Sequence, residues 1–408
     1  MQAVTYKVVA RRVDLLFALL RYALGASREF PVFGAGGVSA SDILAGDVSA
    51  EDWEWLYRQC GRQSVLGGAF SAINSLSSGK PEALGMPHQL YLKWFYQAEG
   101  IRSLNERHYV CSGELTQKFA AEGCQTLILK GQANSLLYPD KFIRQTGDID
   151  IWVGGGRDHV LSVLQKLNLL ERARISNHDV LFSKKVFGEE VEVHFGFGVD
   201  RCSPFANRRL LHFLNAELPA SHLANLQDDA HLVPAGDTKD APSFYVPSNK
   251  FALVMQLSHI YKHLLGLGVG LRQVMDYCVL LRASSDGERA DIAARLESLG
   301  LNRIAGALMW VLSEYLGLES QYLLCPPDAR RGRILLREIM RDGNFGKFAD
   351  RRRGSVWRWW LKNRLRLVSF LPFDFPEVSW FLLRYWASFV FLTPQRILAF
   401  RLYKRRHK

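Results

Sequence analysis

The stretch LILKGQANSLLYPDKFIRQTGDIDIWVGGG, residues 127–156, decides the fold, because two aspartates interrupt an otherwise apolar strand within it. Asp148 and Asp150 are separated by one residue, so on a strand their side chains share a face, roughly 7 Å apart. Two carboxylates this close repel each other unless a cation lies between them. Mg²⁺ prefers carboxylate oxygens together with substrate phosphates. The pattern therefore predicts a metal site, and the alternative is a pair of acids that cap a strand end in solvent.

A second acidic strand follows in the segment VLFSKKVFGEEVEVHFGFG, residues 180–198, which predicts a β-hairpin. Its second arm alternates strictly between polar and apolar residues, so Glu190, Glu192 and His194 share one face. A third carboxylate on a neighbouring strand would complete a two-metal site for phosphoryl chemistry. We expect Glu192 to be this acid, with Glu190 as the second choice; the alternative is a solvent-facing edge strand. His194 is a candidate partner of a metal ligand or a general base.

Residues ahead of the first aspartate have the character of a phosphate-binding turn. A short strand ends at Lys130, and Gly131 begins a short helix, where phosphate oxygens can approach backbone N–H groups. Lys130 and Arg144 supply positive charge for a triphosphate. Gly147 leaves room for a nucleotide over the strand. These residues predict that a nucleoside triphosphate binds beside the acids.

The flanking sequence is helical, so the expected fold class is α+β, a small mixed sheet between two helical lobes. Ser49 is the expected N-cap of a helix with Glu51 and Asp52 in its first turn. A periodic run from Tyr91 to Glu122 ends at Gly123, a suitable C-cap. A polar loop over residues 225–243 leads into a second helical region near Ser248. We expect a helical N-terminal lobe, a small α/β core, a helical C-terminal lobe and a basic aromatic helical tail over residues 1–122, 123–215, 216–330 and 331–408.

Two i, i+4 pairs stand out in the second helical region. His259 and His263 share a helical face, and so do Arg272 and Asp276 on a following helix. In one interpretation, the histidines bridge helices and Arg272 pairs with Asp276. In the other, this lobe closes over the nucleotide, and Arg272 or His263 contacts phosphate or the acceptor. A metal site at His259 and His263 lacks a third soft ligand nearby.

The basic character of the chain belongs to its C-terminal fifth. Residues 330–408 contain 20 Lys and Arg against 5 Asp and Glu, whereas the chain as a whole has 52 against 40. Trp357, Trp359 and Trp360 alternate with arginines there, which suits an anionic membrane surface or single-stranded nucleic acid. The alternative is a solvated basic face with arginine stems packed along core aromatics. No charge-free apolar run reaches the roughly 20 residues of a membrane span.

Other features of the sequence bear on its compartment. The N-terminal apolar run LLFALL is short and Arg21 follows it, which favours an amphipathic helix over a secretory signal. The six cysteines are scattered without a CxxC pair, which argues for a reducing compartment and against a structural zinc site. We therefore expect a cytoplasmic protein, with the inner face of the membrane as an accessory location through the basic tail.

The sequence resembles the nucleotidyltransferase superfamily in the order of its motifs, which are LKG, LYPD, R, GDIDIWV and VEVHF. Within that superfamily it resembles a bacterial nucleotidyltransferase family often found with surface-polysaccharide gene clusters. The resemblance extends to LLFALLRYAL, DWEWLYRQC, HIYKH, GLGVGLRQVMDYC and FDFPE. It implies that Asp148, Asp150 and Glu192 bind the metal and that Lys130 and Gly131 form the phosphate-facing turn. The chain departs from the superfamily in having Lys-Gly-Gln at that turn and sixteen residues between Gly131 and Asp148.

The implied reaction is Mg²⁺- or Mn²⁺-dependent transfer of a nucleotidyl group from an NTP to an acceptor: a sugar, RNA or protein. One alternative is a toxin-like enzyme that modifies tRNA or protein and holds nucleic acid with its basic tail. Another is a catalytically silent scaffold that binds nucleotide. The sequence leaves the acceptor, the preferred base and the oligomeric state open.

Overall fold

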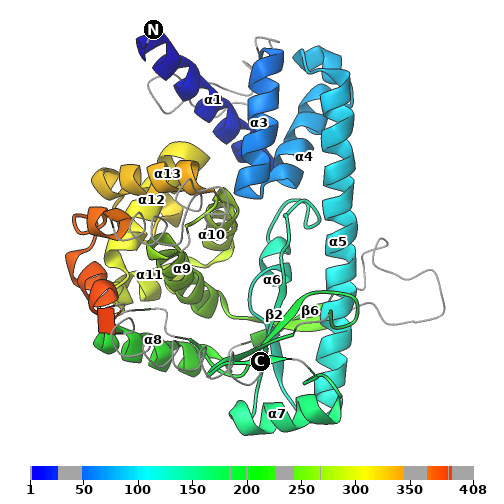
Figure 1. Ribbon diagram of the computed structural model, residues 1–408, viewed down its shortest axis with the longest axis vertical. Helices are drawn as coiled ribbons and strands as arrows, with labels where there is room; N and C mark the ends of the chain where they lie inside the picture. The colour runs from blue at the N-terminus through cyan, green and yellow to red at the C-terminus, as the bar shows by residue number, and fades with distance from the viewer. Residues whose placement is uncertain are drawn as a thin grey trace, which may run out of the picture.

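The computed structural model describes residues 2–25, 48–171, 173–182, 185–198, 201, 203–219, 221–225, 243–266, 268–343, 365–384 and 386–387. Within these residues the chain has the expected α+β fold, with a small sheet and helical lobes on both sides. Figure 1 shows the N-terminal helices at one end, the sheet at the other, and a second helical lobe beside them. One long helix runs along the side of the whole molecule and connects the two ends.

The N-terminal lobe consists of α1 (Gln2–Ala23), α3 (Ala50–Gln63), α4 (Leu66–Ser77), the 3₁₀ helix η1 (Pro81–Leu84) and α5 (His88–Ala121). Ser49 caps α3 as the sequence predicts, and Asp52 completes a reciprocal capping box. Arg12 of α1 also bonds Asp52, with 2.6 Å between Nε and Oδ1. The cap therefore fixes the beginning of α3 and joins it to α1.

The central sheet has five strands in the order β1-β2-β5-β4-β3. The strands β2 and β5 run parallel, and the remaining neighbours are antiparallel, so the sheet is mixed as expected. Two helices, α6 and α7, connect the strands, and both occur where the sequence predicts them. The strand and helix bounds are β1 Thr126–Ile128, α6 Gln132–Ser135, β2 Ile149–Val153, α7 Gly156–Lys166, β3 Arg174–Ile175, β4 Asp179–Leu181 and β5 Val191–His194.

A second hairpin was not expected from the sequence. The strands β6 (Ser221–Asn225) and β7 (Ser243–Pro247) pair on either side of the polar segment predicted as a loop. Phe244 and Val246 of β7 alternate into the core of the sheet. The strand β7 packs against β1 and α5, so its formation depends on tertiary contacts that the local sequence does not indicate. Short strands of this kind depend on cross-strand packing more than on local propensity.

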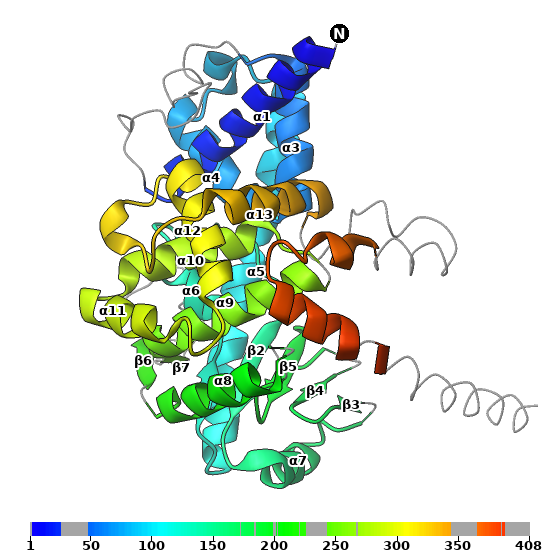
Figure 2. The same cartoon turned by 90° about the vertical axis from the view of Figure 1, so that its left-hand side faces the viewer.

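The C-terminal lobe is built from α8 (Pro204–Glu217), α9 (Asn249–Leu265), α10 (Leu271–Ala283), α11 (Asp286–Arg295), α12 (Asn302–Leu316), η2 (Ser320–Tyr322) and α13 (Ala329–Asp342). Figure 2 shows these helices stacked between the N-terminal helices and the sheet. Ser248 caps α9, where the second helical region was expected to begin. The two helical lobes share one hydrophobic core, whereas the sheet, with α7 and the second half of α5, has its own. The predicted site residues Lys130, Asp148 and Asp150 lie between the sheet and the C-terminal lobe.

Residues 365–384 pack on the C-terminal lobe through buried acids. Tyr261 and Arg303 both contact the carboxylate of Asp374, each at 2.5 Å. Arg201 contacts Glu377 at 3.3 Å, so the FDFPE motif anchors this segment. Trp357, Trp359, Trp360 and the basic residues after 387 lie outside the described residues. Among the helices that the structure describes, none is long and apolar enough to cross a bilayer.

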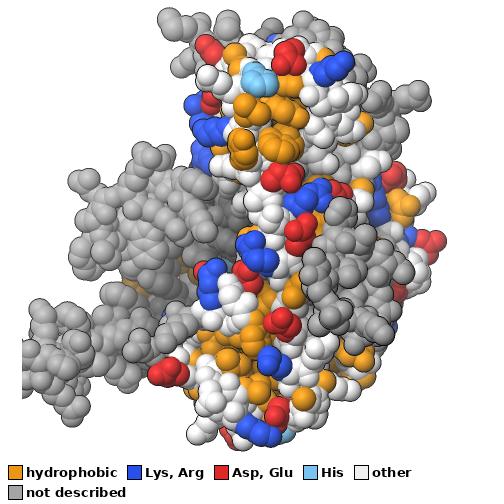
Figure 3. Space-filling model, turned by 90° about the vertical axis from the view of Figure 1, so that its right-hand side faces the viewer, with side chains coloured by type: hydrophobic (Ala, Val, Ile, Leu, Met, Phe, Trp, Pro, Cys, Tyr) orange, Lys and Arg blue, Asp and Glu red, His pale blue; other side chains and the backbone are white. Residues whose placement is uncertain are grey.

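Five cysteines in the described ranges are free thiols, and four of them are buried. Figure 3 views the side along which α5 runs and shows hydrophobic side chains gathered in the upper part of the view and again in the lower part. Leu92, Phe95 and Tyr96 of α5 are among the exposed hydrophobic residues.

The Ser49 cap is tested by replacing Ser49 with alanine. We expect Ser49→Ala to lower the free energy of unfolding by about 1 kcal/mol, because the N–H of Asp52 loses its acceptor. Urea denaturation measures the change. Ser103→Ala, on an exposed position inside α5, serves as the control and should leave stability within about 0.5 kcal/mol. Equal effects of the two substitutions would show that the cap contributes nothing specific.

Candidate active site

Asp150 is the buried acid at the centre of the site. Its neighbours Ile149 and Ile151 are fully buried in the sheet core, and the strand directs Asp150 to the opposite face. Only 2% of Asp150 is exposed. Its Oδ1 lies 3.1 Å from Lys130 Nζ and 3.1 Å from His194 Nε2. These two partners offset the cost of burying the charge, which is severe for an isolated carboxylate.

The strand register brings the second acid to Asp150. In the parallel ladder of β2 and β5, Asp150 pairs with Glu192 and Trp152 pairs with His194. Asp150, Glu192 and His194 each offer one ligand atom, and these three atoms lie within 4.8 Å of one another. Two carboxylates and one imidazole at this spacing fit a divalent cation. These three side chains are therefore the residues that would hold a metal.

The other two predicted acids lie differently. Asp148 directly precedes β2 and is solvent-exposed, but it lines the same cavity as Asp150. It is not part of the three-atom cluster. Glu190 is exposed, and its backbone carbonyl accepts a hydrogen bond from Ile149 at the start of the ladder. The structure therefore brings Glu192, and not Glu190, to Asp150.

The charges of the site are strongly coupled. Burial alone would raise the pKa of Asp150, but Lys130 and the hydrogen bond from His194 outweigh it and lower the pKa to about 2. Burial and the negative charge of Asp150 raise the pKa of Glu192 to about 7. The charge of Asp150, followed by burial, raises the pKa of Asp148. Asp150 is therefore ionised at neutral pH, whereas Glu192 is close to half protonated, and a bound cation would favour the ionised form of both acids.

The turn at Gly131, which the sequence predicts to face phosphate, has a glycine-type backbone conformation and leads into a shorter helix than expected. Gly131 has φ 66° and ψ −106°, a conformation that favours glycine. The helix α6 that follows spans only Gln132–Ser135, so its dipole contributes little to anion binding. The positive charge of Lys130, whose Nζ contacts Asp150, therefore matters more than the helix end.

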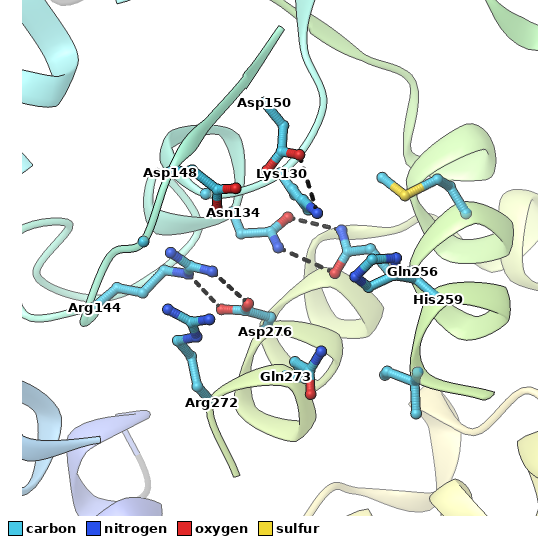
Figure 4. A pocket seen from close by; sticks show the side chains of 14 residues that line it. Lys130, Asn134, Arg144, Asp148, Asp150, Gln256, His259, Arg272, Gln273 and Asp276 are labelled. Carbon is cyan, nitrogen blue, oxygen red and sulfur yellow. Dashed lines mark hydrogen bonds and ion pairs between the residues drawn. The ribbon is translucent and has the colours of Figure 1, made fainter. Parts of the chain in front are cut away.

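Arg144 contacts an acid of the C-terminal lobe. Its guanidinium donates two hydrogen bonds to Asp276 of α10, at 2.7 and 2.8 Å, and both side chains are buried. Tyr138 donates a third to the same carboxylate at 2.8 Å. Figure 4 shows this pair beside the cavity. The bidentate pair fixes the loop before Asp148 to α10.

Arg272 lies one turn before Asp276 and faces the acidic loop. Its Nη1 donates to the carbonyl oxygen of Gln145 at 3.1 Å. A Cβ atom added to Gly147 would lie 3.5 Å from the same nitrogen, an ordinary van der Waals contact, so Arg272 packs directly against the chain ahead of Asp148. Burial, with the nearby charge of Arg144, lowers the pKa of Arg272 to about 10, which leaves it cationic at neutral pH. Arg272 thus brings positive charge to the acids from the opposite lobe.

The histidines of α9 form a close pair at the cavity. The Nε2 atoms of His259 and His263 lie 2.9 Å apart, as i, i+4 spacing allows. Burial, with the positive charge of Lys130, lowers the pKa of both rings, that of His263 to about 3. Both are therefore neutral at neutral pH. They are not part of the three-atom cluster.

Asp179 and His178 were missed by the sequence reasoning. Asp179 opens β4, opposite His194 in the antiparallel ladder, and only 6% of it is exposed. Its Oδ2 lies 3.1 Å from His178 Nε2, and its carboxyl group is close enough to Glu192 to share a hydrogen bond. The sequence signal was the first arm of the predicted hairpin. Extending that arm by one residue ahead of Val180 would have placed Asp179 on the strand.

Two adjoining cavities meet at the acids. The larger, about 330 Å³, lies between the sheet and α9 and has Glu192, His194 and Lys262 in its wall. The smaller, about 50 Å³, lies between α6, α9 and α10 and has Gly131, Arg144 and Arg272 in its wall. Figure 4 shows the smaller one, with residues of the sheet region and of the C-terminal lobe pointing into it. The two cavities share Lys130, Asp148, Asp150, Met255 and His259.

A mixed sheet that presents paired acids to a cavity beside Lys130 and a Gly turn defines a nucleotidyltransferase-type protein. The family described as "Uncharacterised nucleotidyltransferase" matches residues 49–317, and the chain belongs to this family. A search of curated proteins found no match. Among solved structures, the chain is similar to an antigenic nucleotidyltransferase-like protein from Paracoccidioides brasiliensis, at 14% identity and a TM-score of 0.33, over 55% of this chain and 95% of that one.

The Arg144–Asp276 pair predicts a large stability effect. We expect Asp276→Asn to lower the free energy of unfolding by about 3 kcal/mol, because it leaves Arg144 buried without its counter-charge. Denaturant unfolding measures this. Glu319→Gln provides a matched control, since it removes a partly exposed pair with Arg282 and should cost under about 1 kcal/mol. A loss for Asp276→Asn no larger than that of the control would contradict the role of this pair.

Proposed function

We propose that this protein transfers a nucleotidyl group from a nucleoside triphosphate to an acceptor hydroxyl or phosphate, with Mg²⁺ or Mn²⁺ as its metal. The observation that carries the proposal is the cluster of Asp150, Glu192 and His194, whose ligand atoms lie within 4.8 Å. It forms part of the wall of a cavity between the sheet and the C-terminal lobe. Membership in a nucleotidyltransferase family supports the same chemistry.

The proposed roles follow from the positions of the side chains. Asp150 and Glu192, with Asp148 beside them, would hold the metal, which supplies Lewis-acid stabilisation of the phosphates. Lys130 and Gly131 would face the triphosphate, with Gly147 leaving room for it. Arg272 would offset the negative charge that develops on the leaving pyrophosphate. Arg144 would act through Asp276, by holding the loop that carries Asp148 against α10.

The two cavities suggest where the substrates bind. The smaller one has the cationic groups Lys130 and Arg272 in its wall, so we assign the triphosphate to it. The larger one contacts Glu192 and has about the volume of a small-ligand site, so we assign the acceptor to it. The neutral His259 belongs to both walls and lies where the two substrates would meet.

The acceptor class is a separate part of the proposal. The resemblance noted from the sequence favours a sugar acceptor in surface-polysaccharide synthesis, with RNA and protein as the other classes. ATP is the first nucleotide to test. The basic tail would place the enzyme at an anionic surface, such as the inner face of the membrane, or on nucleic acid.

The reaction is tested by incubating the purified protein with labelled NTPs, Mg²⁺ or Mn²⁺, and cell extract. We expect label to pass to a sugar, RNA or protein fraction, and EDTA to abolish the transfer. Asp150→Asn should lower the rate by a factor of about 10³ or more, because the buried charge that holds the metal is lost.

Glu190→Gln is the matched control, because Glu190 lies just before the same strand as Glu192 but is exposed outside the cluster. It should keep the rate within about twofold. Equal transfer rates for Asp150→Asn and the unmodified protein would refute the role of Asp150 in holding the metal. No transfer under any condition would favour a catalytically silent nucleotide-binding scaffold.

A further inference from the structure

His194 belongs to the cluster of side chains that could hold a metal ion. It ends β5 on the same face as Glu192, two residues further along the strand. Its Nε2 lies 3.1 Å from Asp150 Oδ1 and 3.6 Å from Glu192 Oε1. One atom of each of the three residues falls within 4.8 Å of the others. The nitrogen that faces the two acids is therefore at the position of a third ligand.

A further buried acid adjoins the cluster. Only 6% of Asp179 is exposed, and its carboxyl group shares a hydrogen bond with that of Glu192. It belongs to the wall of the same cavity, opposite His194 in the ladder. Two carboxyl groups share a hydrogen bond when one of them carries the proton, so Asp179 holds the side chain of Glu192 next to His194.

The other histidines of the cavity have different partners. His178 contacts Asp179 at 3.1 Å, and His259 and His263 contact each other at 2.9 Å. Among the described residues, His194 is the one histidine in the cluster that fits a metal. The side chain of His194 is 15% exposed, so a cation can reach it from the cavity.

An imidazole ligand changes which metal the site prefers. Mg²⁺ takes oxygen ligands almost entirely and gives up its water reluctantly. Imidazole nitrogen suits first-row transition metals, and carboxylates accept Mn²⁺ as readily as Mg²⁺. A set of two carboxylates and one imidazole therefore favours Mn²⁺ over Mg²⁺, more than three carboxylates would.

We propose that His194 binds the metal directly through Nε2 and that this ligand makes the site prefer Mn²⁺ to Mg²⁺. The inference deepens the proposed function and rests on it for the presence of a metal. The imidazolium form of His194 would release its Nε2 proton to solvent and keep the proton on Nδ1, so that the freed Nε2 lone pair would be available to the cation.

Pulsed EPR of Mn²⁺ bound to the full-length protein tests the ligand itself, independently of any transfer activity. We expect electron spin echo modulation from one directly bound ¹⁴N nucleus. Labelling the histidines with ¹⁵N should replace that modulation with the ¹⁵N pattern. This measurement needs no substitution, so it remains decisive even where a variant fails to fold.

Three variants then identify the residue. His194→Gln should lose the nitrogen modulation and weaken Mn²⁺ binding at least ~10-fold, with a smaller loss for Mg²⁺. His194→Asp, an all-carboxylate set, should recover metal binding without nitrogen modulation and shift the preference toward Mg²⁺ by about tenfold. His178→Gln changes a histidine of the same cavity outside the cluster and should keep the modulation.

Each contrary result has a defined meaning. Bound Mn²⁺ without nitrogen modulation, or modulation that persists in His194→Gln, overturns the assignment and leaves His194 as a hydrogen-bond partner of Asp150. The absence of Mn²⁺ binding overturns it as well. Nucleotidyl transfer without nitrogen modulation would refute this inference alone. Nitrogen modulation without transfer would support it while refuting the proposed function.

Discussion

The buried carboxylate of Asp150 is the constraint on which the site depends. A lone ionised acid at this depth would be strongly destabilising, so the fold supplies Lys130 and His194 as partners. Those contacts in turn fix the spacing of the cluster, because His194 and Glu192 share one strand. The contacts that compensate the buried charge of Asp150 thus also set the geometry of the cluster that we propose to bind the metal.

The second organising contact joins the sheet to the C-terminal lobe. Arg144 and Asp276 bury a bidentate ion pair at the boundary between the two hydrophobic cores. Because Arg272 lies one turn away on the same helix, this pair also sets the position of the cationic side chain that faces Asp148. Substrate groups bound between the sheet and the C-terminal lobe would therefore contact residues of both, held in a fixed relation.

Local features of the sequence predicted much of this arrangement. The change from helical to strand periodicity near residue 124 located the sheet, and the alternation of Glu192 and His194 with Val191 and Val193 predicted the face they share. Ser49 and Ser248 marked helix beginnings. The hairpin β6–β7 was missed, because its strands are short and gain their stability from packing on β1 and α5.

The sequence by itself determined which residues carry charge and which face of each strand they share, because side-chain alternation is a property of the local backbone. Only the tertiary structure decided their partners. Arg144 faces an acid 132 residues away, and Asp150 is buried while Asp148 stays exposed. Asp179 reaches Glu192 through strand pairing. These outcomes depend on chain packing at long range, which sets burial and charge pairing and leaves no local signature.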